Sequence, residues 1–252
     1  MDDINANFCF PLLQNERVKL VPFLASTHAD AFCTSADDAL FAYLPWGPFA
    51  TAEDFISTVL EKRIRPDPGI ALFAVIDQTS AELAGTIGLF STSALHPNSE
   101  IGFIMFIITL PRFQRTHVAS NAAGLLLHFL LDAPAAGGLG LRRVAWKANT
   151  QNTQSVRAAE RLGFRKEGVL RWDRVLPEWK TEVMGGNGGA ARDGDPRPKC
   201  LGGDSIRAGL VLGRLGGWRA RGRRRVNEAH YIKLQKSKYV LATNQVPSHP
   251  NS

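Results

Sequence analysis

Apolar residues recur along this chain with two spacings, which predict an alternation of strands and helices. Spacings of three and four positions predict helices over residues 27–39, 51–65, 118–131 and 153–162. Short apolar runs rich in branched and aromatic residues predict strands over residues 17–21, 70–76, 83–90, 100–108 and 141–148, and a last one after Phe164. The resulting order is a strand, two helices, three strands, a helix, a strand, a helix and a strand.

The helix expected around residue 155 carries clear signals at both ends. Three apolar residues recur at helical spacing inside it: Val156, Ala159 and Leu162. Asn152 or Thr153 can cap its start, and Gly163 suits a left-handed residue at its end. Ser155 then stands in the first turn, where a ligand could reach it.

A second segment joins an apolar strand to a helix through a short polar turn. Residues 100–108 form a nearly continuous apolar run, as expected of a strand buried on both faces. The polar residues Gln114, Arg115 and Thr116 follow, and the helix begins near Val118. A strand, a small polar turn and a helix start together direct backbone N–H groups and the positive end of the helix dipole at a diphosphate.

Together the two segments resemble the GNAT superfamily of acyl-CoA N-acyltransferases, in the branch that includes the ribosomal-protein N-terminal acetyltransferases of fungal type. The family reads Asn, Asn, Ser, then Arg or Lys, Leu, Gly, Phe, and finally Glu-Gly. The matching positions here are Asn149, Asn152, Ser155, Arg161, Leu162, Gly163, Phe164, Glu167 and Gly168. Gln114 and Ala119 match the family's pyrophosphate loop, Gln/Arg-x-x-Gly-x-Gly/Ala, while His117 stands where that loop often has glycine.

The resemblance implies an α/β fold with a mixed, mostly antiparallel central sheet flanked by helices. It also implies acetyl-CoA as co-substrate, without a metal. The residues expected to bind acetyl-CoA are Met105, Ile107, Gln114, Arg115, Thr116, His117, Val118, Ala119, Asn152 and Ser155. Arg115 could instead be an exposed loop cation.

Acetyl transfer from a thioester to an amine needs a polarised carbonyl, a neutral amine and a proton for the departing thiolate. Backbone N–H groups near Met105 to Ile107 can stabilise the developing oxyanion. In the resemblance Ser155 lies near the thioester sulfur and is the expected general acid, although it could instead cap its helix. Glu100 is the expected general base if partial burial raises its pKa, or else a carboxylate at the rim that attracts a cationic acceptor. Asp173 is a weaker candidate for the base.

The acceptor side is expected at the turn over residues 44–49, because the family places its first two helices there. Trp46 and Phe49 are the expected substrate contacts, and both could equally be core anchors. The predicted function is the transfer of an acetyl group from acetyl-CoA to a primary amine of a protein N-terminus or a small molecule. The alternative is an acyl-CoA-binding pseudoenzyme, impaired by His117 or by the loss of its last strand.

Composition bears on where the protein works. Its three cysteines, Cys9, Cys33 and Cys200, are far apart and have no histidines at metal-ligand spacing, which argues against a disulfide framework and against a zinc site. The sequence shows no signal peptide and no apolar stretch of membrane-spanning length. These features predict a cytoplasmic protein without a membrane partner.

The basic charge is concentrated at one end of the chain. Residues 206–252 hold ten Lys and Arg residues against one acidic residue, a net charge of +9, whereas the whole chain carries +7. Residues 1–205, the expected acetyltransferase domain, therefore carry about −2. Nucleic acid would be a partner only through the basic segment.

Residues 206–252 are expected to form a basic, disordered tail, and two explanations of it stay open. The tail could be a genuine extension that associates with nucleic acid. It could also be translated out of frame, since codons for Val211 to Trp218, read one nucleotide later, can give WDDWE, with which fungal members of the branch end. The last strand would then be lost or altered, with residues 206–212 as a partial substitute beside Trp146.

Overall fold

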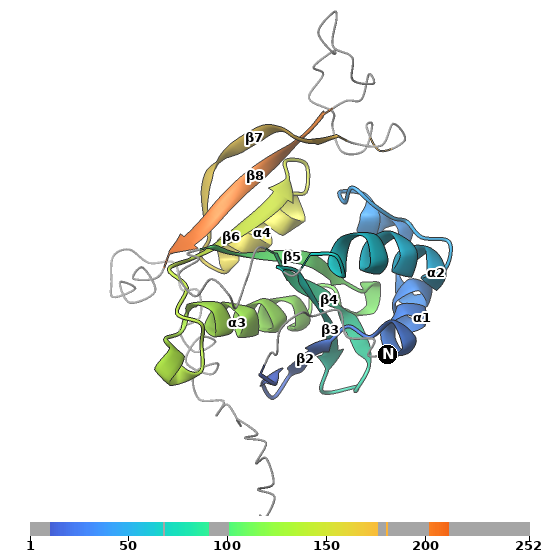
Figure 1. Ribbon diagram of the computed structural model, residues 1–252, viewed down its shortest axis with the longest axis horizontal. Coiled ribbons are helices and arrows are strands. Elements are labelled where there is room, and N and C mark those ends of the chain that lie inside the picture. The colour runs from blue at the N-terminus through green and yellow to red at the C-terminus, as the bar shows by residue number, and fades with distance from the viewer. Residues whose placement is uncertain (1–10, 68, 91–100, 176–179, 181–201, 212–252) are drawn as a thin grey trace, which may run out of the picture.

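The structure is a computed structural model that describes residues 11–67, 69–90, 101–175, 180 and 202–211 of the 252-residue chain. In this part of the chain, eight strands form one sheet in the order β1-β2-β3-β4-β5-β6-β8-β7 (Figure 1). The strands are β1 (Leu13–Gln14), β2 (Val18–Pro22), β3 (Ala71–Asp77), β4 (Leu83–Phe90), β5 (Ile101–Thr109), β6 (Arg143–Asn149), β7 (Arg165–Val175) and β8 (Gly202–Val211). Neighbours run antiparallel except β5 and β6, which run parallel. The predicted mixed, mostly antiparallel sheet is confirmed.

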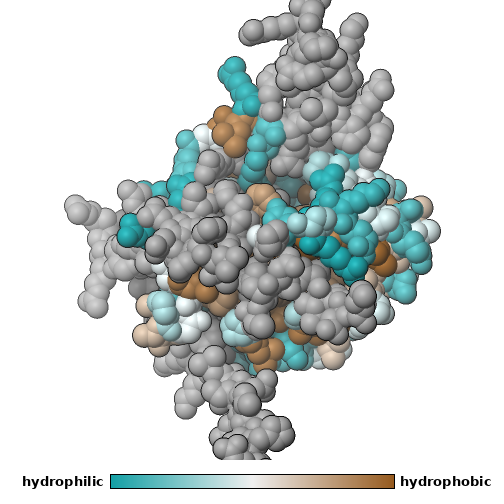
Figure 2. Space-filling view, in the orientation of Figure 1, coloured by the Kyte–Doolittle hydropathy of each residue, from teal (hydrophilic) through white to brown (hydrophobic). Residues whose placement is uncertain are grey.

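Helices cover both faces of this sheet (Figure 1). One face carries α3 (Val118–Leu131) and α4 (Thr153–Arg161). The other carries α1 (Ala25–Ser35), α2 (Ala52–Phe55) and the π-helix η2 (Ile56–Ile64). Short 3-10 helices are η1 (Asp38–Phe41), η3 (Pro111–Phe113) and η4 (Pro134–Ala136). We call α1, α2 and η2 the second helical layer. Exposed charged residues of η2 contribute to its hydrophilic outer surface (Figure 2).

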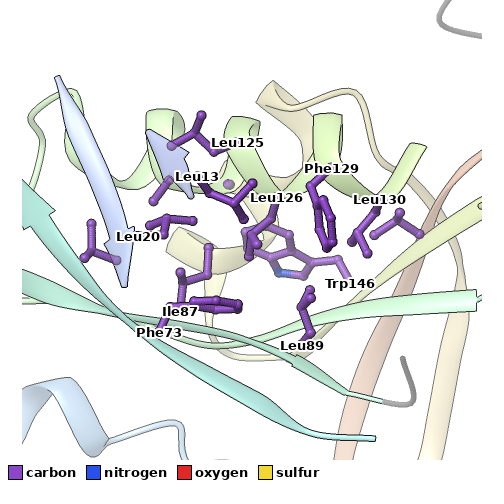
Figure 3. Packing of buried hydrophobic residues seen from close by; sticks show 14 of the residues in the cluster. Leu13, Leu20, Phe73, Ile87, Leu89, Leu125, Leu126, Phe129, Leu130 and Trp146 are labelled. Atoms are coloured by element: carbon purple, nitrogen blue, oxygen red, sulfur yellow. The ribbon is translucent and has the colours of Figure 1, made fainter. Parts of the chain in front are cut away.

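Each face of the sheet has its own hydrophobic core, which explains why the strands read as apolar runs. In β3, Phe73 and Val75 belong to the core under α3, whereas Leu72 and Ala74 belong to the core under α1 and α2. A strand buried on both faces has no polar side, so its sequence shows no alternation. Figure 3 shows the first core, in which side chains of α3 pack onto Phe73 and Trp146.

The N-terminal helices differ from the sequence prediction. The helix predicted over residues 51–65 starts as expected, with Thr51 Oγ1 accepting from the Asp54 N–H at 3.1 Å. It then continues as η2, where the Arg65 N–H bonds to the carbonyl of Leu60, five residues earlier. The helix predicted over residues 27–39 ends at Ser35 and is followed by η1. Apolar spacing does not distinguish these hydrogen-bond patterns, because all of them place residues three to five apart on one side.

The last strand in the sequence, β8, lies inside the sheet between β6 and β7. It pairs with β6 over residues 143–149 and with β7 over residues 165–175. The boundary predicted at residue 205 therefore falls within β8, and the sheet continues to Val211. Pairing with β6 on one side and β7 on the other satisfies the backbone groups of residues 206–211, which therefore complete the sheet. The remaining part of the predicted tail, residues 212–252, lies outside the described residues.

A chain that ends after residue 205 should be less stable than one that ends after residue 214. The shorter chain loses residues 206–211, so amide groups of both β6 and β7 lose their partners. At about 0.5–1.5 kcal/mol for each hydrogen bond, we expect the free energy of unfolding to fall by ~3 kcal/mol or more. Urea denaturation of the two truncated chains and the full chain measures this. Equal stability of the two truncated chains would contradict the role of β8.

Candidate active site

The two parallel strands pair over only part of their length. Pairing stops at Ile104 and Trp146, whereas β5 continues to Thr109 and β6 to Asn149. Among the described strands, the amide groups that this end of β5 turns toward β6 therefore have no partner. Because the strands are parallel, both chains leave the sheet at the same edge, and α3 and α4 begin there. This gap at the carboxyl ends of β5 and β6 is the candidate active site.

β5 carries a bulge beside this gap. Met105 pairs with Gly88 and Ile108 pairs with Thr86, so two residues of β5 stand opposite one residue of β4. Phe106, within the bulge, has a φ of +52°, which is uncommon for a residue other than glycine. Its carbonyl accepts a hydrogen bond from Thr86 Oγ1 at 2.9 Å. The bulge takes backbone amides between Met105 and Ile108 out of the regular ladder.

The predicted phosphate-binding turn follows β5. Gln114, Arg115 and Thr116 are all exposed, and Arg115 adopts a left-handed φ of +60°. Thr116 Oγ1 donates to the carbonyl of Phe113 at 2.6 Å and accepts from the Val118 N–H at 3.3 Å. The Thr116 hydroxyl thus holds the turn, and the Gln114 N–H bonds to the carbonyl of Pro111 at 3.2 Å. The exposed Arg115 stands beside them at the start of α3.

His117 is the N-cap residue of α3, and its ring points to the sheet. Its φ is −71°, so this position does not require the glycine that the family often has. Nε2 lies 2.8 Å from Asp77 Oδ1, and the side chain makes no capping bond to the helix. The N–H groups of Ala119 and Ser120 therefore keep the open donor positions of a helix start.

Asp77 ties the phosphate-binding turn to the hairpin between β3 and β4. Its Oδ2 accepts from the Ser80 N–H at 2.9 Å and from the Ser80 hydroxyl at 3.1 Å, while Oδ1 faces His117. Burial alone would raise the pKa of Asp77. The hydrogen bonds from Ser80 and His117 outweigh burial, so the pKa lies below its ordinary value and the carboxylate stays charged.

Ser155 lies in the first turn of α4, and Asn152 is the residue that caps this helix. The Asn152 side-chain oxygen accepts from the Ser155 N–H at 3.0 Å. The Ser155 hydroxyl makes a different contact, because Oγ accepts from the indole Nε1–H of Trp146 at 3.0 Å. Trp146 is buried on β6 with its ring against Phe164. Asn152, not Ser155, therefore caps α4, and Trp146 of β6 fixes the position of the Ser155 hydroxyl oxygen.

The α4 helix ends as its sequence indicated. Gly163 has a φ of +91°, and its N–H bonds to the carbonyl of Glu160. The N–H of Phe164 reaches back to the carbonyl of Ala159, which completes a Schellman motif. This turn places Phe164 beneath Trp146, so the family's Leu-Gly-Phe run supports the ring that contacts Ser155.

The candidate general bases stand differently. Glu100 lies outside the described residues. Asp173 on β7 is partly buried, and its Oδ1 lies 2.5 Å from Nζ of Lys147 on β6. A nearby ammonium group stabilises the charged form of a carboxylate, so a carboxylate in such an ion pair is less suited to accepting a proton.

The predicted acceptor residues belong to an aromatic cluster next to the bulge. Trp46 is 7% exposed and stacks on the partly exposed Phe49, with ring centres 6.0 Å apart. Trp46 also lies 5.6 Å from the ring of Phe106, and Phe41 packs against both Trp46 and Phe49. We call Phe41, Trp46, Phe49 and Phe106 the aromatic cluster. Its members anchor the second core and also adjoin the bulge of β5.

Sequence reasoning missed Lys180, which is buried near this cluster. Its Nζ donates to the carbonyls of Phe41 at 2.7 Å, Leu44 at 2.5 Å and Trp46 at 2.8 Å. Burial lowers the pKa of Lys180 to about 8, so the ammonium form still predominates at neutral pH. No local motif marks this lysine, because its partners are more than 130 residues away.

The described residues offer no metal centre and no activated thiol. No group of three or more His, Cys, Asp or Glu side chains there could hold a metal ion, and no described helix is long and apolar enough to cross a membrane. Burial, with the carboxylates of Asp30, Glu53 and Asp54, raises the pKa of Cys33 to about 11. This thiol is therefore a poor nucleophile at neutral pH.

A mixed sheet whose parallel pair parts beside a polar turn and a helix start is the framework of an acyl-CoA-dependent acyltransferase of the GNAT class. The sequence profile described as "Acetyltransferase (GNAT) domain" matches residues 17–165, which is more than half of the chain. The chain therefore belongs to the GNAT acetyltransferase family.

Individual relatives agree with this assignment. The chain is 28% identical over 169 residues to the uncharacterized N-acetyltransferase YoaA of Bacillus subtilis (strain 168), covering 64% of this chain and 87% of that protein. Its structure is similar to that of a GCN5-related N-acetyltransferase from Brucella melitensis, with a TM-score of 0.62, 25% identity and coverage of 79% and 78% of the two chains. It shares only the fold, at 18% identity and a TM-score of 0.55, with the microcin C7 self-immunity acetyltransferase MccE, solved with acetyl-CoA and AMP, covering 79% and 94%.

Asp77→Asn should destabilise the protein at neutral pH but not in acid. The pKa of Asp77 lies lower in the folded protein than the value of about 3.9 for an unfolded chain. Its charge therefore stabilises the folded state above that value, and this contribution is lost as the pH falls through the folded pKa. We expect a loss of about 1–2 kcal/mol at pH 7 and little at pH 3, measured by urea denaturation.

Asp30→Asn is the matched control, because Asp30 is exposed on α1. It should leave stability unchanged at both pH values. A loss of equal size at pH 7 and pH 3 in Asp77→Asn would show that the charge of Asp77 does not matter.

Proposed function

We propose that this protein transfers an acetyl group from acetyl-CoA to a primary amine of a protein N-terminus or a small molecule. The observation that carries the proposal is the Ser155 hydroxyl, held by the Trp146 indole at the edge where β5 and β6 part. The matches between residues 149 and 168 favour the branch of the ribosomal-protein N-terminal acetyltransferases. The acceptor would then be the α-amino group of a protein.

The residues around the gap fit acetyl-CoA. The exposed turn at Gln114, Arg115 and Thr116 offers a guanidinium and the backbone amides of Arg115 and Thr116 to the diphosphate, beside the open start of α3. The pantetheine arm would then lie along the unpaired side of β5 near Met105 and Ile107. When bound, acetyl-CoA supplies the acetyl group as a thioester, and its thiol is the leaving group.

The bulge of β5 supplies the donors that the carbonyl oxygen needs. Its amides lie outside the ladder, and the bond from Thr86 Oγ1 to the carbonyl of Phe106 fixes their direction. Amides held in place before the reaction stabilise a developing oxyanion without reorganisation. Backbone geometry rather than a charged side chain would thus polarise the thioester.

Ser155 is the proposed proton donor to the departing thiolate. Its oxygen accepts a hydrogen bond from the Trp146 indole N–H, so one lone pair is occupied and the hydroxyl proton is free to point elsewhere. Solvent would then return the proton that Ser155 gives up. The acceptor amine must lose its own proton before attack, and Glu100 stays the proposed base for this step.

The first test concerns the phosphate-binding turn. Acetyl-CoA should raise the melting temperature of the protein, because a ligand that binds only the folded state stabilises it. Arg115→Glu should abolish most of this shift by placing a negative charge beside the diphosphate. Differential scanning fluorimetry with and without acetyl-CoA measures both.

Arg63→Glu makes the same charge change on the exposed side of η2 and should keep the full shift. An unchanged shift in Arg115→Glu would remove this turn from the cofactor site.

The second test concerns Ser155 and needs a panel of acceptors. Release of CoA is followed with a thiol reagent for peptides with free N-terminal Ala or Ser, for a polyamine and for an arylalkylamine. With the best acceptor, Ser155→Ala should lower kcat by roughly tenfold to a hundredfold and leave the affinity for acetyl-CoA nearly unchanged.

Thr153→Ala removes an exposed hydroxyl from the same turn of α4 and serves as the control. It should keep kcat within about twofold of the original protein. Full activity of Ser155→Ala would rule out proton donation by this residue.

A further inference from the structure

The Lys180 side chain binds backbone carbonyls of the turn over residues 41–46. The side chain is 2% exposed, and its ammonium group donates to the carbonyls of Phe41, Leu44 and Trp46. An ammonium group has three N–H donors, so these contacts match its donors one for one. The planar fork of an arginine could not direct three donors to carbonyls that converge on one point.

The turn held by Lys180 carries the aromatic cluster. Trp46, whose carbonyl Lys180 binds, stacks on Phe49 and lies against Phe106. Phe106 is the bulge residue of β5, and its own carbonyl is fixed by Thr86 Oγ1. A continuous chain of contacts therefore runs from Lys180 through the turn and the rings to the bulge.

We propose that Lys180 is a positioning residue, which sets the aromatic cluster against the β5 bulge and so fixes the acceptor side of the active site. The catalytic part of this inference rests on the proposed function. Lys180 itself contacts no reacting atom, because its three donors are directed at carbonyls. An apolar residue in its place would take one donor from each of three carbonyls. The carbonyl of Phe41 would keep the Leu44 N–H, whereas the carbonyls of Leu44 and Trp46 would need water in place of the ammonium group, so the turn would have to open.

The test compares Lys180→Met with Lys62→Met. Methionine keeps the length of the stem and removes the ammonium group, and Lys62 is exposed on η2 of the same layer. In Lys180→Met, hydrogen exchange should become faster in peptides covering residues 41–49 and 104–108 and stay unchanged along α3. With the best acceptor of the panel, kcat/KM for the amine should fall at least about tenfold, while the Kd for acetyl-CoA stays within about twofold. Lys62→Met should change none of these quantities.

A second variant covers the case in which Lys180→Met does not fold. Trp46→Leu keeps the backbone carbonyl that Lys180 binds and removes the ring that meets Phe106. It should reproduce the loss of kcat/KM without faster exchange at residues 41–44.

Three outcomes would overturn the inference. They are unchanged exchange of residues 41–49 in Lys180→Met, a kcat/KM of Lys180→Met within about twofold of the original protein, and full activity of Trp46→Leu. If the original protein acetylates no amine of the panel, the proposed function fails instead. The exchange measurement then still decides whether Lys180 positions the turn and the bulge.

Discussion

The candidate active site depends on the end of pairing between β5 and β6. Two parallel strands satisfy their backbone groups by hydrogen bonding to each other, and between β5 and β6 that bonding stops at Ile104 and Trp146. The amides beyond this point need another partner, and a ligand laid along β5 can provide one. The bulge at Phe106 adds to this by turning further amides out of the ladder. The site is thus made from backbone that the sheet leaves unpaired.

Trp146 connects the parts of this arrangement. Trp146 is the last residue of β6 that pairs with β5, and on the other side of β6 it pairs with Ala208 of β8. Its ring packs in the core under α3, and its indole N–H reaches Ser155 on α4. One residue therefore marks where the strands part and also fixes the hydroxyl beside that point. A core substitution here would alter the stability of the protein and the position of the Ser155 hydroxyl together.

Much of this framework could be predicted from local sequence. The sequences of β3 to β6 are apolar because helices cover both faces of the sheet. Asn152 and Gly163 are residue types that indicate the start and the end of α4. The two-residue strand β1 is too short to show a pattern, and the π-helix η2 has the same apolar spacing as an α-helix. The left-handed φ of Arg115 and of Phe106 has no signal in the residue types, since glycine is the usual choice.

Hydrogen bonds between the side chains and carbonyls of distant segments could not be predicted. His117 looked like a substitute for a glycine, but its φ is ordinary and its ring bonds to Asp77, which precedes it by 40 residues. Lys180 bonds to carbonyls, which every residue has, so no residue type in the turn marks its partners. Such contacts follow from the completed fold rather than from any segment of it.

The place of β8 has a consequence for how the chain folds as it is made. Among the described strands, β7 joins the sheet only through β8, and β8 comes after it in the sequence. During synthesis β6 and α4 emerge first, and β6 remains an exposed edge with Trp146 at its centre until residues 202–211 leave the ribosome. The half of the molecule that carries Ser155 is therefore the last to become protected, so a translating ribosome that stalls near residue 200 would present an unfinished sheet to chaperones and proteases.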